Sequence, residues 1–388
     1  MNNDINEIYQ RFGEKFCMCP FLGGFYQSHG VTPKHQNTKA STITPCSLTY
    51  WENDQQFHVV NNSIHQSRNT EVWRNMRRAF AEGRYEELPQ CKICHEAERS
   101  GGHAARFGAN LHFTTNCRDI NLVDEIQKII DNDYYTDRVA TLDWFPSNYC
   151  NYSCVMCAGG ASSSRMSFEN DQRRQQKIDF ELEMKQYDVD ISTQDLSRFD
   201  TQHIIHNAET DDFIDVINGL DVINFTGGET IMQKKVRDMI VKLSNSENAK
   251  NKTIFLLTNA SSYPEDLMPV FEKFYRVIYM CSIDGTGPAL EYQRRNSHWA
   301  EVEQNLSRFR DRRSEYPNIR LQCCSTVNIF NILYLAELAH WIDAQGFDFI
   351  YWNMLHEAFY FSISTLPDLA KYYVKKKLDG QDVAADTR

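Results

Sequence analysis

The chain has 388 residues, a formal net charge of -11 and 12% aromatic residues. This length can bury a sizeable core and favours two domains. The negative charge excludes a general electrostatic surface for nucleic acid, and the basic segments at 74–80 and 371–377 are typical of solvated helix faces. The sequence starts without a charged and apolar leader and has no apolar run of membrane-spanning length, so we expect a cytoplasmic protein with no membrane partner.

The first region, residues 1–115, is predicted to be a small, cysteine-rich α+β domain. It combines short strand-like segments and many turns with one amphipathic helix that starts at Thr70 and stops at Gly83. Residues 116–138 are interpreted as a linker with a helix that begins at Asp124. The domain boundary is therefore expected within this linker.

From residue 139 to 366 the sequence alternates between strand-like and helix-like segments. Helical patterns, such as those at 234–243 and 299–313, separate the strands, and this alternation predicts parallel strands joined by right-handed crossovers. Six such units indicate an α/β fold, either a partial barrel or an open, doubly wound sheet. The six predicted strands lie at 139–145, 222–225, 253–257, 277–283, 319–327 and 347–354.

Two segments depart from this alternation. Residues 158–220 are too long for one crossover helix and predict a charged helix followed by an insertion. The charged run is typical of a solvated helix face, and a lid over an active site is the alternative. Residues 367–388 are interpreted as a C-terminal tail.

Twelve cysteines in a chain of this length fall well below the density of a disulfide scaffold, and clustered cysteines in a reducing compartment indicate metal binding. The most informative group is Cys150, Cys154 and Cys157, which form a C-x3-C-x2-C pattern directly after the first barrel strand. Three such thiolates hold three irons of a cubane cluster and leave the fourth iron open. A structural zinc site, the alternative, needs paired C-x2-C units or a histidine, and neither lies nearby.

A second motif, Gly227-Gly228-Glu229, follows the second barrel strand. Glycines let the backbone approach a ligand closely, and Glu229 then offers a carboxylate to an ammonium group. Alone, the motif indicates a tight turn. Because parallel strands end at one edge of the sheet, the two motifs together predict a cofactor site there.

With both motifs, the sequence resembles the radical S-adenosylmethionine superfamily, whose fold is a six-stranded partial TIM barrel. The resemblance implies that the three cysteines bind a [4Fe-4S] cluster, that S-adenosylmethionine chelates the open iron, and that Gly227, Gly228 and Glu229 bind its methionine part. Reductive cleavage would then give methionine and a 5′-deoxyadenosyl radical that abstracts hydrogen from a substrate. Met156 departs from the aromatic residue common before the last cysteine, so the contact to adenine is expected to differ.

Three further residues are assigned by the same resemblance. Ser282 and Asp284 match polar positions that hydrogen-bond the cofactor ribose, although both are also ordinary turn formers. Arg294 matches an arginine that pairs with the cofactor carboxylate, and a surface ion pair of little energetic value is the alternative.

The N-terminal cysteines form a third constellation. Cys19, Cys46, Cys91 and Cys94 supply four thiolates, enough to saturate a second [4Fe-4S] cluster or a zinc ion. Their order resembles the twitch auxiliary-cluster module, which is related to the SPASM module, and Cys17 is a competing ligand. The remaining five cysteines are interpreted as packing residues: Cys17, Cys117, Cys281, Cys323 and Cys324.

These resemblances imply a radical enzyme with an external, flavodoxin- or ferredoxin-like electron donor. Its substrate is expected to be a peptide or protein side chain, with a small molecule or RNA as alternatives. A different class of protein, a non-catalytic binding protein stabilised by zinc at both cysteine groups, is the remaining hypothesis.

Overall fold

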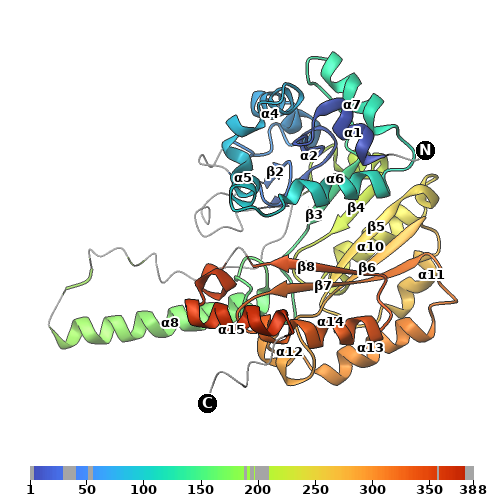
Figure 1. The fold of residues 1–388 in the computed structure, drawn as a ribbon. Helices are drawn as coiled ribbons and strands as arrows, with labels where there is room; N and C mark the ends of the chain where they lie inside the picture. The colour runs from blue at the N-terminus through green and yellow to red at the C-terminus, as the bar shows by residue number, and fades with distance from the viewer. Residues whose placement is uncertain are drawn as a thin grey trace.

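The computed structural model describes residues 4–28, 41–50, 56–187, 190–192, 196, 209–355 and 358–380. Its centre is one eight-stranded sheet in the order β2-β1-β3-β4-β5-β6-β7-β8 (Figure 1). Neighbouring strands are parallel except for the β1-β2 hairpin. The strands are β1 (Phe25–Ser28), β2 (Ser41–Thr44), β3 (Thr141–Phe145), β4 (Val222–Phe225), β5 (Thr253–Thr258), β6 (Arg276–Ser282), β7 (Ile319–Val327) and β8 (Phe349–Met354).

The six strands from β3 to β8 follow one another across the sheet in chain order. A doubly wound sheet would reverse direction at its middle, so this singly wound order is that of a partial barrel. The predicted α/β class is confirmed, and each predicted barrel strand agrees with the structure to within two residues at either end. The helices between the strands are α8 (Ser163–Gln186), α9 (Phe213–Gly219), α10 (Lys234–Ser244), α11 (Met268–Phe271), α12 (Pro288–Gln293), α13 (Trp299–Asp311) and α14 (Leu335–Ala344).

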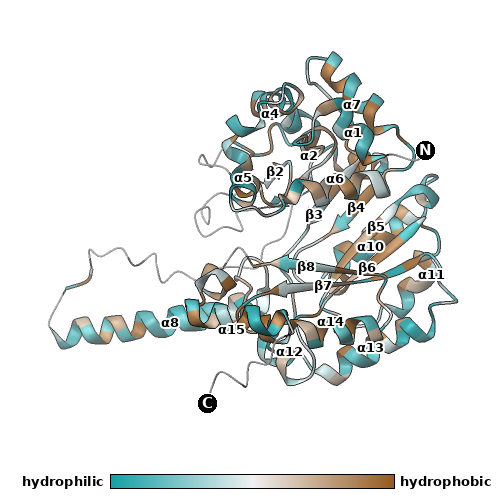
Figure 2. Ribbon diagram, in the orientation of Figure 1, coloured by the Kyte–Doolittle hydropathy of each residue, from teal (hydrophilic) through white to brown (hydrophobic). Residues whose placement is uncertain are grey.

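The two faces of the barrel sheet have different environments. Along β7, buried and half-buried residues alternate, as the two-residue period of a strand requires. Cys323 is fully buried against the helices, whereas Cys324 is half-buried on the opposite face. On β3, Trp144 is fully buried, with ring centroids 4.9 Å from Phe213 and 5.8 Å from Phe225. Figure 2 shows hydrophobic residues along β5 and β6.

The N-terminal region places its helices beside the β1-β2 end of the sheet (Figure 1). Its strand β1 pairs in parallel with β3, so the region predicted as a small domain shares the sheet of the barrel. Helix α4 confirms the helix predicted after Thr70, and α7 occupies the predicted linker. The helices are α1 (Ile5–Phe12), α2 (Cys19–Leu22), α3 (Ile64–Arg68), α4 (Glu71–Ala81), α5 (Lys92–Arg99), α6 (Ala105–Asn116) and α7 (Leu122–Asp131).

Helix α8 begins the long segment predicted as an insertion and extends away from the sheet (Figure 1). Its far half is solvated, with the Leu182 side chain 61% exposed. Most of the segment that the lid interpretation concerns, residues 188–189, 193–195 and 197–208, lies outside the described residues. The predicted C-terminal tail contains helix α15 (Asp368–Leu378). None of the helices in the described part of the chain is both long and apolar enough to cross a membrane.

Candidate functional site

The loop after β3 brings the three cysteines of the C-x3-C-x2-C motif together. The Asn148 amide donates to the Gly159 carbonyl at 2.9 Å, and the Ser162 hydroxyl donates to the Tyr152 carbonyl at 2.5 Å, so the loop folds back on itself. Ser162 is also the N-cap of α8, because its oxygen accepts the Arg165 N–H. The loop is therefore fixed to the start of the next helix.

Within the loop, the Cys154 thiol donates a hydrogen bond to the Cys157 sulfur. This bond raises the pKa of Cys154 and lowers that of Cys157, and burial raises both. Burial also raises the pKa of Cys150 to about 11. Cys154 is buried and the other two thiols are half-buried, so this set of three clustered thiols has the donor chemistry of an iron–sulfur cluster. Met156, between two of them, is half-buried.

The Gly227-Gly228-Glu229 segment packs directly on the cysteine loop. The Glu229 N–H donates to the Tyr149 carbonyl at 2.8 Å, and the Gly228 N–H donates to the Ala161 carbonyl at 3.2 Å. A Cβ on Gly228 would lie 2.1 Å from the Tyr149 oxygen, and one on Gly227 would lie 2.4 Å from the Phe145 ring. With positive φ at both positions as well, glycine is required for the two loops to approach each other.

Glu229 is fully buried at this junction. Its carboxylate accepts the Thr258 hydroxyl and the Asn259 N–H, both at 2.6 Å, which ties the end of β4 to the end of β5. Burial raises the pKa of Glu229 to about 7, although these two hydrogen bonds lower it. A carboxylate has further lone pairs, so Glu229 can accept a hydrogen bond from a bound ammonium group as well.

Arg294 also lies at the cysteine loop, with one terminal nitrogen 4.0 Å from the Cys154 sulfur. Its guanidinium forms an ion pair of 2.7 Å with Asp284, and the two side chains are 11% and 0% exposed. The alternative of a surface ion pair is therefore wrong. Burial alone would lower the pKa of Arg294, but Asp284 and the thiols of Cys154 and Cys157 raise it above its ordinary value.

Asp284, which follows β6, is held by a residue at the end of α12 and by one on β7. Its second oxygen accepts the Thr326 N–H at 2.7 Å, so the carboxylate is already occupied by Arg294 and by the end of β7. Ser282, predicted beside it, is half-buried at the end of β6 and pairs in register with Cys324. Cys324, predicted only as a packing residue, lies close enough to Arg294 and Asp284 to influence the pKa of the arginine. Strand alternation in the sequence places Cys323 and Cys324 on opposite faces but does not say which of them faces inward.

The N-terminal cysteines line a separate chamber of about 560 Å³. The opposite wall comes from the chamber face of the sheet, including Asp143, Asn224 and Gln322. Helix α6 closes the chamber, with the His112 ring 4.8 Å from the ring of Phe255 on β5. The structure places Cys17 with the four predicted thiols, so five cysteines share the chamber: Cys17, Cys19, Cys46, Cys91 and Cys94.

Hydrogen-bond donors surround these thiols. The first two N–H groups of α6, from Ala105 and Arg106, donate to Cys94, and the Thr49 hydroxyl lies 3.5 Å from the Cys46 sulfur. Cys17 accepts from both the thiol and the N–H of Cys19, which lowers its pKa. Burial raises the pKa of Cys46 to about 12. Thiols surrounded by peptide N–H groups fit an iron–sulfur cluster.

Across the described residues, no three or more His, Cys, Asp or Glu side chains converge closely enough to hold a single metal ion.

Asp143 is an acidic group on the sheet wall of the chamber. It receives a hydrogen bond from the Asn224 amide on the neighbouring strand. Burial raises the pKa of Asp143 to about 6, and that hydrogen bond opposes the rise. The sequence alone did not single out this pair, although both residues interrupt apolar strands.

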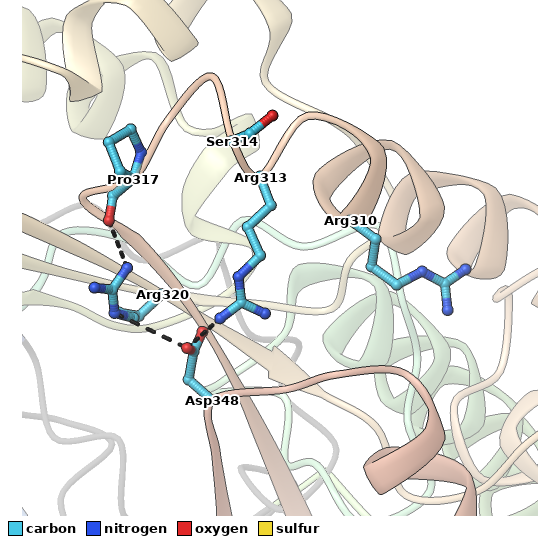
Figure 3. Close-up of a pocket in the computed structure, with 6 residues that line it drawn as sticks. All are labelled: Arg310, Arg313, Ser314, Pro317, Arg320 and Asp348. Carbon is cyan, nitrogen blue, oxygen red and sulfur yellow. Dashed lines mark hydrogen bonds and ion pairs between the residues drawn. The ribbon is translucent and has the colours of Figure 1, made fainter.

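A surface hollow of about 610 Å³ lies at the opposite end of the strands. Figure 3 shows Arg313 and Arg320 pointing toward Asp348, with Arg310 on the neighbouring helix pointing elsewhere. Asp348 and Arg320 lie at the starts of β8 and β7, whereas the cysteine loop follows the end of β3. This hollow is therefore remote from the predicted site.

Comparisons with known proteins found similarity at the level of structure. No family model and no curated protein matches the sequence. Native anSMEcpe with bound AdoMet and the Cp18Cys peptide is similar over 63% of this chain and 62% of its own, with 15% identity and a TM-score of 0.36. Streptococcus suis SuiB bound to S-adenosylmethionine covers 78% of this chain and 62% of its own, with 11% identity and a TM-score of 0.39.

Streptococcus suis SuiB bound to the precursor peptide SuiA covers 85% of this chain and 64% of its own, with 11% identity and a TM-score of 0.40. This chain thus spans about three fifths of the length of the solved chains that it matches. Identities and TM-scores this low do not assign an activity to it.

The contact at Gly228 yields the first prediction. In Gly228→Ala, the new Cβ would collide with the Tyr149 carbonyl in a left-handed conformation, so we expect the free energy of unfolding to fall by about 3 kcal/mol or more. Urea unfolding followed by circular dichroism measures this. Gly219→Ala, at an exposed helix end with free space around it, is the control and should stay within about 0.5 kcal/mol of wild type. Equal stability of the two variants would contradict the prediction.

The pKa of Glu229 yields a second prediction. Because burial raises this pKa from 4.5 to about 7, the folded state retains a proton between these pH values that the unfolded state releases. The Glu229 contribution to stability is therefore full below pH 4.5 and declines by about 3 kcal/mol up to pH 7. Thermal unfolding of metal-free protein at pH 5 and pH 8 should show a larger decline for wild type than for Glu229→Gln. Parallel pH profiles would refute the shifted pKa.

Proposed function

We propose that this protein is a radical S-adenosylmethionine enzyme. The observation that carries the proposal is the direct packing of the three-cysteine loop against Gly227-Gly228-Glu229 at the ends of β3 and β4. One loop offers thiols for three irons, and the other offers backbone groups and a carboxylate beside them. When bound, a reduced [4Fe-4S] cluster supplies the electron that cleaves S-adenosylmethionine to methionine and a 5′-deoxyadenosyl radical.

The surrounding residues have separate roles in this proposal. Cys150, Cys154 and Cys157 would hold the cluster, and Glu229 would accept a hydrogen bond from the cofactor ammonium. Arg294, which Asp284 orients, faces the cysteine loop and would attract the cofactor carboxylate. Ser282 and Asp284 remain the proposed contacts of the ribose, with Asp284 acting mainly through Arg294 because one of its oxygens accepts the Thr326 N–H and the other is in the ion pair.

A second [4Fe-4S] cluster is proposed in the N-terminal chamber, as in the twitch-type module. The support is the gathering of five thiols in one chamber, with N–H donors directed at Cys46 and Cys94. Cys19, Cys46, Cys91 and Cys94 remain the proposed ligands. Cys17 is an equally close competitor, because it accepts hydrogen bonds from Cys19 and its charge raises the pKa of Cys46, Cys91 and Cys94.

A peptide or protein side chain is the proposed substrate. Two features support it. The chamber offers Asp143 and Asn224 as polar contacts among apolar walls. Strand β8 ends the sheet with exposed apolar side chains, including Phe349 and Tyr351, and an extended peptide can pair with such an edge. A small molecule that fits the chamber is the second candidate.

The cofactor assignment predicts a specific loss. Anaerobically reconstituted protein should contain about eight irons, and the variant Cys150→Ala/Cys154→Ala/Cys157→Ala about four, because one four-iron cluster loses its ligands. With dithionite and S-adenosylmethionine, wild type should release 5′-deoxyadenosine and the variant should not, as measured by chromatography. Cys281→Ala, a buried cysteine outside both groups, is the control. Continued release by the triple variant would overturn the proposed function.

The substrate class predicts a mass change. A short peptide encoded next to the gene, co-expressed with the protein, should be modified, and mass spectrometry of the purified peptide would detect this. The triple cysteine variant is the matched control, and the modification should disappear with it. An unchanged peptide mass with the active enzyme would favour a small-molecule substrate.

A further inference from the structure

The proposed function leaves one buried cation of the cysteine chamber without a role. Arg106, the second residue of α6, lines the chamber and is only 3% exposed. One terminal nitrogen of its guanidinium pairs with Glu98 on α5. Its Nε and its other terminal nitrogen, Nη1, are buried and have no hydrogen-bond partner. An unpartnered N–H group of a buried cation lowers the stability of the fold, so we expect these two donors to have an acceptor in the functional protein.

The guanidinium is held rigidly by its neighbours. The Tyr85 hydroxyl donates to the second oxygen of Glu98 at 2.6 Å, which fixes the carboxylate that binds Arg106. The Tyr85 and Phe107 rings have centroids 4.8 Å and 5.1 Å from the guanidinium carbon. Because Glu98 anchors one terminal nitrogen and two rings pack against the guanidinium, the Nε–H and Nη1–H groups point in a fixed direction.

The Arg106 charge acts electrostatically on several thiols of the chamber. Burial raises the pKa of Cys91 and Cys94, and the Arg106 charge opposes the rise. At Cys17, the hydrogen bond from Cys19 lowers the pKa most, and Arg106 lowers it further. The backbone N–H of Arg106 already donates to Cys94. The cation therefore lies next to several sulfurs that the cluster would use.

We propose that Arg106 donates its Nε–H and Nη1–H groups to the sulfur of the N-terminal cluster and thereby raises the reduction potential of that cluster. The inference rests on the proposed auxiliary cluster. Reduction adds an electron to a group that thiolate ligands already make anionic, so a nearby cation and N–H donors stabilise the reduced state more than the oxidised state. Arg106 thus acts on the potential of the cluster by direct contact, and Glu98 partly offsets its charge.

The opposite charges of this pair give opposite predictions. The full chain carrying Cys150→Ala/Cys154→Ala/Cys157→Ala isolates the N-terminal cluster, and an EPR-monitored redox titration measures its potential. At a fixed potential, Arg106→Met should decrease the ratio of reduced to oxidised cluster by tenfold or more, which is 59 mV for a one-electron couple. Glu98→Gln, which removes the negative partner and keeps its shape, should increase the ratio. Arg106→Lys should fall between wild type and Arg106→Met.

Arg99→Met provides the control, because Arg99 is exposed in the last turn of α5 and its loss removes the same charge outside the chamber. It should leave the ratio unchanged. If Arg106 has a purely structural role, every Arg106 and Glu98 variant should instead lose iron. The reduction potential of the cluster would then not move in opposite directions. If Arg106→Met loses its cluster, the test rests on Arg106→Lys and Glu98→Gln. An unchanged reduction potential in both of these variants overturns the inference.

The iron content separates this inference from the proposed function. About four irons in the triple cysteine background, with the expected shifts, support the role of Arg106 even if the wild-type protein fails to cleave S-adenosylmethionine. No iron in that background overturns the inference, because there is then no N-terminal cluster, and leaves the site at Cys150 untouched.

Discussion

The site depends on one close approach, that of the Gly228 backbone to the Tyr149 carbonyl. There is no room for a side chain between them, so the ends of β3 and β4 can lie together only with glycine at this position. The contact places the Glu229 carboxylate beside the cysteine loop and directs it toward the end of β5. From there, the order of the strands carries the site to Asp284 and Arg294 at the other side of the loop.

Two buried charges on either side of the loop are stabilised differently. Arg294 has an anionic partner in Asp284, so its charge is retained inside the protein. Glu229 forms no ion pair within the described part of the chain: its hydrogen bonds come from neutral donors such as Thr258 and the Asn259 N–H, and burial still raises its pKa, so its charge is costly. A cationic ligand group would remove that cost. The asymmetry suits a ligand with an ammonium group on one side and a carboxylate on the other.

Much of the barrel could be predicted from the sequence because each strand combines a short apolar run with a chemically distinctive end. The positions of β3 to β8 followed from pattern and spacing alone, whereas the choice between Cys323 and Cys324 for the inward face came only from the structure. The approach of Gly228 to Tyr149 could not be predicted, because it joins residues 79 positions apart through loop geometry. Arg106 was missed for a similar reason, since its burial comes from Glu98, Tyr85 and the chamber rather than from any local pattern.

Strand β1 joins the cysteine-rich region to the barrel by backbone hydrogen bonds rather than by a flexible linker. Cys19 and Phe25 are six residues apart, and β1 lies against β3, whose end carries Cys150. Deletion of the N-terminal residues would leave β3 as an unprotected sheet edge, which is a template for aggregation. A barrel expressed alone is therefore expected to be insoluble, and the backbone pairing of β1 with β3 links the chain segments that carry the two cysteine groups.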